Sequence, residues 1–272
     1  MRILFLGDIV GRSGRDAVVE RLPALRKDLR LDAVIINAEN AAAGFGLTPQ
    51  ICHDLFEAGA DCITTGNHVW DQREIIGYIS GTTRVLRPAN YPEGAPGRGH
   101  TVIETVTGFK ILVANVMCRL FMDALDDPFA AADKICKAYR MGAQVNAIIV
   151  DVHGEASSEK QAMGYYLDGR ASLVVGTHTH VPTADTRILP QGTGYQTDAG
   201  MCGAYDSVIG MDSAAPVQRF VRKMPGEKLR PAEGPATVCG TFIEVDPKTG
   251  RCTRIEPVRV GGDLSPAMPV IA

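Results

Sequence analysis

The chain has 272 residues, of which 45% are hydrophobic and 22% are charged. This composition is typical of a soluble globular protein and excludes bulk disorder. The formal net charge of −3 excludes a broadly basic surface for non-specific binding of nucleic acids or membranes. A chain of this length buries a large core without disulfide bonds, and we expect one domain over residues 1–272.

The N-terminus and the cysteines indicate the cellular context. No run of about 18 apolar residues occurs, so we expect no membrane-spanning helix. Gly7 and Asp8 follow the apolar N-terminus directly, which predicts a buried first strand rather than a signal peptide. The seven cysteines are odd in number and form no Cys-x-x-Cys pair, which favours reduced thiols and a cytoplasmic protein.

The predicted elements alternate between strands and helices up to about residue 180. In chain order we expect a strand over 2–6, a helix over 13–30, a strand over 33–36, a helix over 48–58, a strand over 62–65, a helix over 71–79, a hairpin over 101–106 and 110–116, a helix over 128–141, a strand over 147–151, a helix over 157–167 and a strand over 173–175. Short strands then follow over 186–189, 194–197, 237–245 and 251–260.

Local signals set several of these boundaries. Ser13 with Asp16 indicates a capping box for the first helix, which Pro23 should kink or divide. Thr48, Pro49 and Gly59 have the residue types expected at the N-cap, first position and end of the second helix. We therefore predict an α/β fold with two packed mixed β-sheets flanked by helices, in which the C-terminal third supplies much of the second sheet.

Five of the predicted strands end in polar side chains. The residues at these ends are Asp8, Glu39, Asn40, Asn67, His68, His153, His178 and His180. Ligands of open α/β sheets bind beyond the carboxyl ends of the strands, so these side chains are expected to converge. His178 and His180 would point the same way if that segment is extended. The other two histidines, His53 in a helix and His100 at the start of a hairpin strand, are interpreted as structural.

Seven of these residues are candidate metal ligands. Carboxylates, amide oxygens and imidazoles without a thiolate suit Fe, Mn, Zn, Co or Ni rather than a structural zinc site. Seven ligands exceed the need of one tetrahedral ion but match two ions about 3.5–4 Å apart that share a carboxylate and a water. Two divalent ions, Asp8, Glu39 and a bridging hydroxide together leave a net charge of +1, which suits an anionic phosphate ester.

These motifs resemble the calcineurin-like metallophosphoesterase superfamily, and most closely its YmdB-like branch. The segments that carry the resemblance are LGDIVGRSGR, NAEN, TGNHVWD, GTHTHVPTAD and TDAGMCGAYDSVIGM, spread over nearly the whole chain. Two positions depart from the wider superfamily: Val10 stands where a histidine is usual, and Glu39 stands where the bridging acid is usually Asp. The YmdB-like branch shares both changes, and Asn40 can supply an oxygen in place of the missing histidine.

The resemblance implies a calcineurin-like sandwich and a role for each site residue. One ion would bind Asp8, Glu39, Asn40 and His180, and the other Glu39, Asn67, His153 and His178, with Glu39 bridging. Iron or manganese is favoured for both ions, divalent or trivalent, with Zn, Mg and Co as alternatives. His68 would protonate the leaving oxygen or stabilise charge on the phosphoryl group after a metal-bridging hydroxide attacks phosphorus.

The implied activity is hydrolysis of a small phosphodiester, a cyclic nucleotide, with 2′,3′-cyclic AMP favoured. The ligand set alone does not separate a diesterase from a phosphomonoesterase. A regulatory protein that binds a nucleotide or RNA with little turnover is the alternative from another class. A homo-oligomer is possible, no membrane partner is expected, and the small-residue segment 193–211 is either a substrate-side loop or a plain connection.

Overall fold

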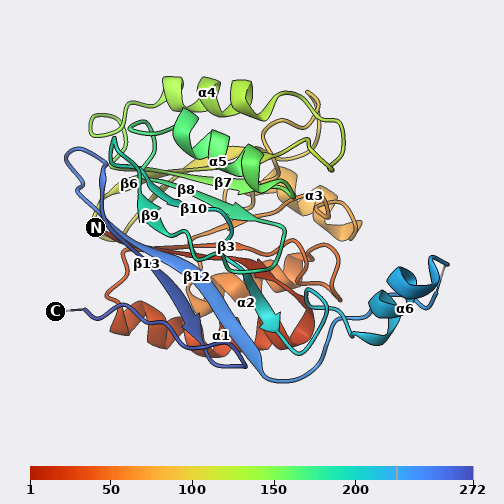
Figure 1. Cartoon of the computed structure of the whole chain (residues 1–272). Coiled ribbons are helices and arrows are strands. Elements are labelled where there is room, and N and C mark those ends of the chain that lie inside the picture. The colour runs from red at the N-terminus through yellow and green to blue at the C-terminus, as the bar shows by residue number, and fades with distance from the viewer. Residues whose placement is uncertain (225, 272) are drawn as a thin grey trace.

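Two β-sheets packed face to face form the centre of the molecule, in a computed structural model that describes residues 1–224 and 226–271 (Figure 1). In the described residues the first sheet has seven strands, ordered β2-β11-β12-β1-β3-β4 with β13 paired to β12. They are β1 (Arg2–Leu6), β2 (Asp8–Ile9), β3 (Ala33–Asn37), β4 (Cys62–Thr64), β11 (Met201–Ala204), β12 (Ala236–Val245) and β13 (Cys252–Val260).

The second sheet has six strands over the same described ranges, ordered β5-β6-β7-β8-β10-β9. They are β5 (His100–Glu104), β6 (Lys110–Met117), β7 (Ala147–His153), β8 (Leu173–Thr177), β9 (Arg187–Ile188) and β10 (Gly194–Gln196). Both sheets are mixed: β1, β3 and β4 run parallel, as do β6, β7, β8 and β10, whereas β12 is antiparallel to β1 and β13.

Helices cover both outer faces of the sheet pair. The helices of the described residues are α1 (Gly11–Asp28), α2 (Pro49–Ala58), α3 (Glu74–Gly81), α4 (Pro128–Ala138), α5 (Ser157–Tyr166) and α6 (Ala214–Arg222). Figure 1 shows α4 and α5 on one side of the sheets, α1 and α2 on the other, and α6 extending away from the body. The predicted α/β fold with two packed mixed sheets flanked by helices is therefore confirmed.

Apolar side chains on both faces of the strands hold the layers together. In β1, Ile3 and Phe5 pack between the two sheets, whereas Leu4 and Leu6 pack against the helices. In β7, Ile149 joins the layer between the sheets and its neighbours face α4 and α5. Each central strand is covered on one face by the other sheet and on the other face by helices, so its sequence is a continuous apolar run. The packed layers also set the position of each strand end.

The second helix follows its local sequence signals. The Thr48 hydroxyl accepts a hydrogen bond from the Ile51 backbone N–H at 3.4 Å, Pro49 is the first helical residue, and Gly59 ends the helix with φ of 115°. A left-handed residue at this point is cheapest for glycine, because no Cβ clashes with the carbonyl of the preceding turn. The predicted caps of this helix are confirmed.

The first helix differs from its prediction at both local signals, the capping box at Ser13 and the proline at position 23. It begins at Gly11, after an N-cap residue, Val10, that makes no side-chain hydrogen bond. Ser13 therefore lies inside the helix and donates its hydroxyl to Ala232 O at 3.2 Å, so the predicted capping box is wrong. Pro23 does not divide the helix, which continues through it to Asp28. Tertiary contacts beyond the first turn, rather than a cap, fix where this helix starts.

The C-terminal third also differs from its prediction. Only β9 and β10 join the second sheet, whereas β11, β12 and β13 extend the first sheet beside β1. The expectation that this third supplies much of the second sheet is therefore wrong. The segment 193–211, expected to be a loop, contains β11, which runs parallel to the two-residue strand β2 and lies next to Asp8.

Two further expectations from the sequence concern disulfide bonds and membrane-spanning helices. All seven cysteines are buried and none forms a disulfide bond. No helix in residues 1–224 or 226–271 combines the length and the apolar character needed to cross a membrane.

Candidate metal centre

The strand-end residues meet at one edge of the two sheets. Asp8 begins β2, Glu39 and Asn40 follow β3, and Asn67 follows β4. From the second sheet, His153 ends β7, and His178 and His180 follow β8. The carboxyl ends of the parallel strands share this edge, so residues distant in sequence lie together, as predicted.

A cluster of four side chains lies closest together. His153 Nε2 is 3.0 Å from Asn67 Oδ1, 3.1 Å from Glu39 Oε1 and 3.2 Å from His178 Nδ1. Glu39 and His153 are fully buried, and the ligand atoms of Glu39, His153 and His178 all lie within 4.8 Å of one another. The structure thus brings together the four residues that the resemblance assigns to one ion.

Hydrogen bonds behind the cluster orient His153. Thr177 Oγ1 lies 2.7 Å from Asp151 Oδ1 and 2.9 Å from His153 Nδ1. The Thr177 hydroxyl donates to Asp151, so its oxygen is left to accept the proton of His153 Nδ1. In the neutral imidazole, Nε2 then carries a lone pair that faces the cluster, as a metal-ligating histidine requires.

The remaining atoms of the cluster are also acceptors. His178 Nε2 lies 3.4 Å from Glu155 Oε2, which places its proton on that side and leaves a lone pair on Nδ1. Glu39 Oε1 is buried and has no hydrogen-bond partner among the described residues. Acceptors that face one another at about 3 Å repel unless a cation lies between them. The residues present therefore fit a metal ion.

The other assigned residues each present a free acceptor. Asn40 donates its amide to Gly44 O at 2.9 Å, while its buried Oδ1 has no partner in the described part of the chain. His180 Nδ1 donates to Ile209 O at 2.7 Å, which leaves a lone pair on Nε2. The carboxylate of Asp8 accepts from the His178 backbone N–H at 3.1 Å. These atoms are suitable for a second ion beside Glu39.

The pKa values of the site show an electrostatic preference for positive charge. Burial lowers the pKa of His153, but Glu39 and Asp8 outweigh burial and raise it to about 9. Burial raises the pKa of Glu39, yet His153 and the other histidines lower it to about 2. Burial raises the pKa of Asp8 to about 6, and burial together with His153 lowers that of His178 to about 3. A metal ion would supply the positive charge that a proton on His153 supplies without it.

His68 lies at the rim of this cluster and differs from the candidate ligands. Its backbone N–H donates to Glu39 Oε2 at 3.2 Å, while its ring Nδ1 lies 2.8 Å from Asp71 Oδ2. Because a carboxylate accepts, this contact places a proton on Nδ1 and leaves Nε2 toward the cavity. Glu39, His68, Asn40, His178 and His180 line this cavity of about 240 Å³, with apolar walls from Phe45, Ile209, Met211 and Leu229.

The segment that carries His178 and His180 is not extended. His178 has φ of 95° and His180 has φ of 65°, so both backbones lie in the left-handed region. The expectation that the two side chains point the same way along an extended segment is therefore wrong. His178 Nδ1 contacts His153, whereas His180 Nδ1 contacts Ile209 O, so the two imidazoles approach the site through different atoms.

Asp151 and Thr177, the two residues that orient His153, were not among the site residues predicted from the sequence. Asp151 is fully buried, and besides Thr177 it accepts hydrogen bonds from Thr64 and Asn37. A signal existed in the sequence, because a carboxylate inside an otherwise apolar strand requires partners to stay buried. His53 and His100 pack against Tyr78 and Tyr139, consistent with structural roles.

Gly66 makes room for the cluster. A Cβ atom at this position would overlap Glu39 Oε2 and His153 Nε2. We expect Gly66→Ala to weaken Mn²⁺ binding by more than the roughly 10–100-fold that follows loss of a supporting contact. Titration of the metal-free variant with Mn²⁺ measures this effect.

The matched control for that variant is Gly77→Ala in α3. A Cβ at Gly77 meets nothing within 4 Å, and alanine favours the helix. We expect wild-type Mn²⁺ affinity and equal or higher thermal stability in the control. Equal affinity in both variants would contradict the close approach of Gly66 to the cluster.

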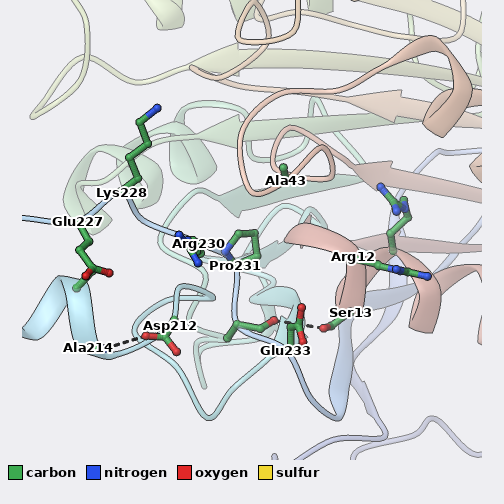
Figure 2. Close-up of a pocket in the computed structure, with 13 residues that line it drawn as sticks. Arg12, Ser13, Ala43, Asp212, Ala214, Glu227, Lys228, Arg230, Pro231 and Glu233 are labelled. Atoms are coloured by element: carbon green, nitrogen blue, oxygen red, sulfur yellow. Dashed lines mark hydrogen bonds between the residues drawn. The ribbon is translucent and has the colours of Figure 1, made fainter.

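A larger basin lies beside this cavity. It has a volume of about 840 Å³ and is bounded by the start of α1, by residues around Asp212 and by the segment 227–233 (Figure 2). The segment 228–231 separates the two spaces, because Leu229 lines the cavity while Lys228 and Arg230 line the basin. Four basic side chains, Arg12, Arg15, Lys228 and Arg230, face the basin together with three acidic ones.

Comparisons with known proteins find similar proteins that match almost the whole chain. A model of the YmdB-like protein family matches residues 4–258. The chain is 47% identical over 263 residues to the 2′,3′-cyclic-nucleotide 2′-phosphodiesterase of Bacillus subtilis (strain 168), covering 97% of this chain and 98% of that protein.

Two crystal structures are similar over nearly their whole length. A hypothetical protein from Thermus thermophilus has a TM-score of 0.89 and 44% identity, covering 97% of this chain and 100% of that one. A novel phosphatase from Mycoplasma pneumoniae also has a TM-score of 0.89, with 33% identity, covering 97% of this chain and 94% of that one.

Proposed function

The chain belongs to the YmdB-like protein family, and from that premise we propose that it is a metal-dependent phosphodiesterase that hydrolyses cyclic nucleotides, with 2′,3′-cyclic AMP favoured. The observation that carries this proposal is the cluster of candidate metal ligands formed by Glu39, Asn67, His153 and His178, in which Glu39 and His153 are buried. The similarity to a cyclic-nucleotide phosphodiesterase over 97% of this chain supports the substrate class.

Two metal ions are proposed for the site. Asp8, Glu39, Asn40 and His180 would hold one ion, and Glu39, Asn67, His153 and His178 the other. The mixture of imidazole, carboxylate and amide oxygen favours iron or manganese, with Zn, Mg and Co as alternatives. When bound, such ions neutralise phosphate charge and lower the pKa of a coordinated water toward about 7.

The chain's own residues then bind the substrate and move a proton. A cyclic phosphodiester carries one negative charge, and the apolar walls at Phe45, Met211 and Leu229 suit the nucleoside that remains attached to it. His68 lines the same cavity, with Asp71 accepting the proton of its Nδ1. From this position the doubly protonated ring would deliver its Nε2 proton to the departing sugar oxygen.

We also propose that residues 1–272 form one domain. The layer between the sheets combines Ile3 and Phe5 from the start of the chain with Ile149 and Ile243 from its later parts. A core shared in this way gives neither half a complete hydrophobic interior of its own.

The decisive experiment uses protein purified without added metal. Elemental analysis gives the metal and its stoichiometry, and the same sample is assayed against 2′,3′-cyclic AMP, its 3′,5′ isomer, p-nitrophenyl phosphate and bis-p-nitrophenyl phosphate. We expect about two ions per chain and faster hydrolysis of the 2′,3′-cyclic nucleotide and the diester than of the monoester. A preference for the monoester would make the protein a phosphomonoesterase, and lack of metal would overturn the proposal.

The basin favours a second candidate function, which is recognition of an RNA end with little turnover. Lys228 and Arg230 have no side-chain partner among the described residues and stand one residue either side of Leu229 in the cavity wall. Basic side chains there could bind phosphates upstream of a cyclic phosphate terminus. Tight binding of a short oligoribonucleotide with that terminus, without product in metal-replete protein, would favour this candidate. Lys228→Ala should then weaken binding of the oligonucleotide but not that of the cyclic mononucleotide.

A further inference from the structure

A buried ion pair holds the segment that carries His178 and His180. Lys160 is 1% exposed, and its Nζ donates to Asp198 Oδ2 at 2.8 Å and to Thr177 O at 2.7 Å. Asp198 is fully buried. The pair joins α5 to the residues that precede β11, directly behind the end of β8.

Asp198 also restrains the residue between the two histidines. Its Oδ2 accepts from the Thr179 backbone N–H at 3.1 Å and from the Thr179 hydroxyl at 2.7 Å. Its Oδ1 accepts from the Gly200 N–H at 2.9 Å. Lys160 and Asp198 therefore bind the main chain on both sides of His178 and fix the loop to its neighbour.

The restrained loop has an unfavourable backbone. The left-handed conformations of His178 and His180 are costly for residues with a Cβ and persist only where surrounding contacts enforce them. Gly176 permits the close approach of this loop to its neighbour, since a Cβ there would overlap Thr197 O and would lie 2.8 Å from Lys160 Cδ. A buried ion pair seldom adds net stability over apolar residues of the same size, so a role in holding a conformation accounts better for its presence.

We propose that Lys160 and Asp198 are positioning residues for the metal ligands. Their contacts hold the main chain from Thr177 to Thr179 so that His178 Nδ1 and His180 Nε2 face the site. This inference rests on the proposed metal-dependent function. It adds two residues that touch neither metal nor substrate and act only through the loop.

The test is a titration of the full-length, metal-free protein with Mn²⁺ alone. Calorimetry measures the affinity, and the electron paramagnetic resonance signal reports the surroundings of the bound ion. Lys160→Met keeps much of the side-chain volume and removes both hydrogen bonds. We expect Mn²⁺ affinity to fall about 10–100-fold, the usual effect of losing a partner behind a metal ligand, with an altered signal from any ion that binds.

The matched control is Arg26→Met. Arg26 pairs with Asp61 at 2.6 Å on the opposite side of the first sheet, and neither residue lies at the metal site. We expect this variant to lose stability but to bind Mn²⁺ with wild-type affinity. Wild-type affinity in folded Lys160→Met, or an equal loss in Arg26→Met, would overturn the positioning role.

Thr179→Val keeps the proposal testable if Lys160→Met does not fold. It removes the 2.7 Å hydrogen bond to Asp198 without leaving a buried charge unpaired. A several-fold weaker Mn²⁺ affinity at unchanged fold supports the positioning role, and unchanged affinity contradicts it. If the wild-type protein itself binds no Mn²⁺, Fe²⁺ or Zn²⁺, the metal-dependent function fails first, and the positioning role fails with it.

Discussion

Glu39→Gln is expected to remove most of the bound metal and nearly all hydrolysis. Glu39 is 1% exposed, and its Oε1 lies 3.1 Å from His153 Nε2. In glutamine the amide oxygen can keep the hydrogen bond from the His68 N–H, and the amide nitrogen then faces His153. That N–H donates to the lone pair that a metal would need, and the negative charge at the centre of the site is lost.

The same hydrogen bond protects the fold of this variant. In the metal-free protein the change replaces the buried Glu39–His153 ion pair with a neutral hydrogen bond. No buried polar group is left without a partner, so thermal stability should fall only modestly. Elemental analysis and turnover of bis-p-nitrophenyl phosphate measure the effect. Glu159→Gln is the matched control, because Glu159 is also buried but accepts from the backbone N–H groups of Arg119 and Leu120 rather than facing the candidate ligands. Wild-type hydrolysis by Glu39→Gln would show that Glu39 does not bridge the metals.

The location of the site could be predicted because it depends on simple rules. Each central strand is an apolar run that is covered on both faces. Polar residues that follow its carboxyl end therefore lie at the edge of the sheets, where ligands of α/β folds bind. Glu39, Asn67 and His153 came from three such ends, and the structure places their ligand atoms next to one another. The proposal of a metal site rested on residue types at the strand ends, without knowledge of any distance.

The structural features that could not be predicted from the sequence depend on long-range contacts. The spacing of His178 and His180 says nothing of their left-handed backbones, which the buried contacts of Asp198 enforce. The strands β2 and β11 have two and four residues, and they form because β2 pairs with β11 and β11 pairs with β12. The helix α1 starts without a side-chain cap, so no local signal marks its first residue.

His68→Ala is expected to keep the metal and to lower turnover of 2′,3′-cyclic AMP by about 10²–10⁴-fold, the usual contribution of an acid–base group. The ring of His68 contacts Asp71 at 2.8 Å and faces the cavity, whereas only its backbone N–H contacts Glu39. Alanine retains that N–H, so the four facing acceptors should stay in place. His53→Ala is the matched control, since His53 in α2 packs against Tyr78 of α3 and should tolerate the change without loss of activity.

The leaving group separates the two roles considered for His68. A sugar oxygen needs a proton as it departs, whereas p-nitrophenolate is a stable anion that leaves without one. If His68 is the general acid, its loss should impair the cyclic nucleotide severely and bis-p-nitrophenyl phosphate only slightly. An equal fall with both substrates would assign His68 to stabilising charge on the phosphoryl group instead. Loss of bound metal in His68→Ala would contradict both roles and make His68 a ligand, because its Nε2 already faces the cavity that Glu39 and His178 line.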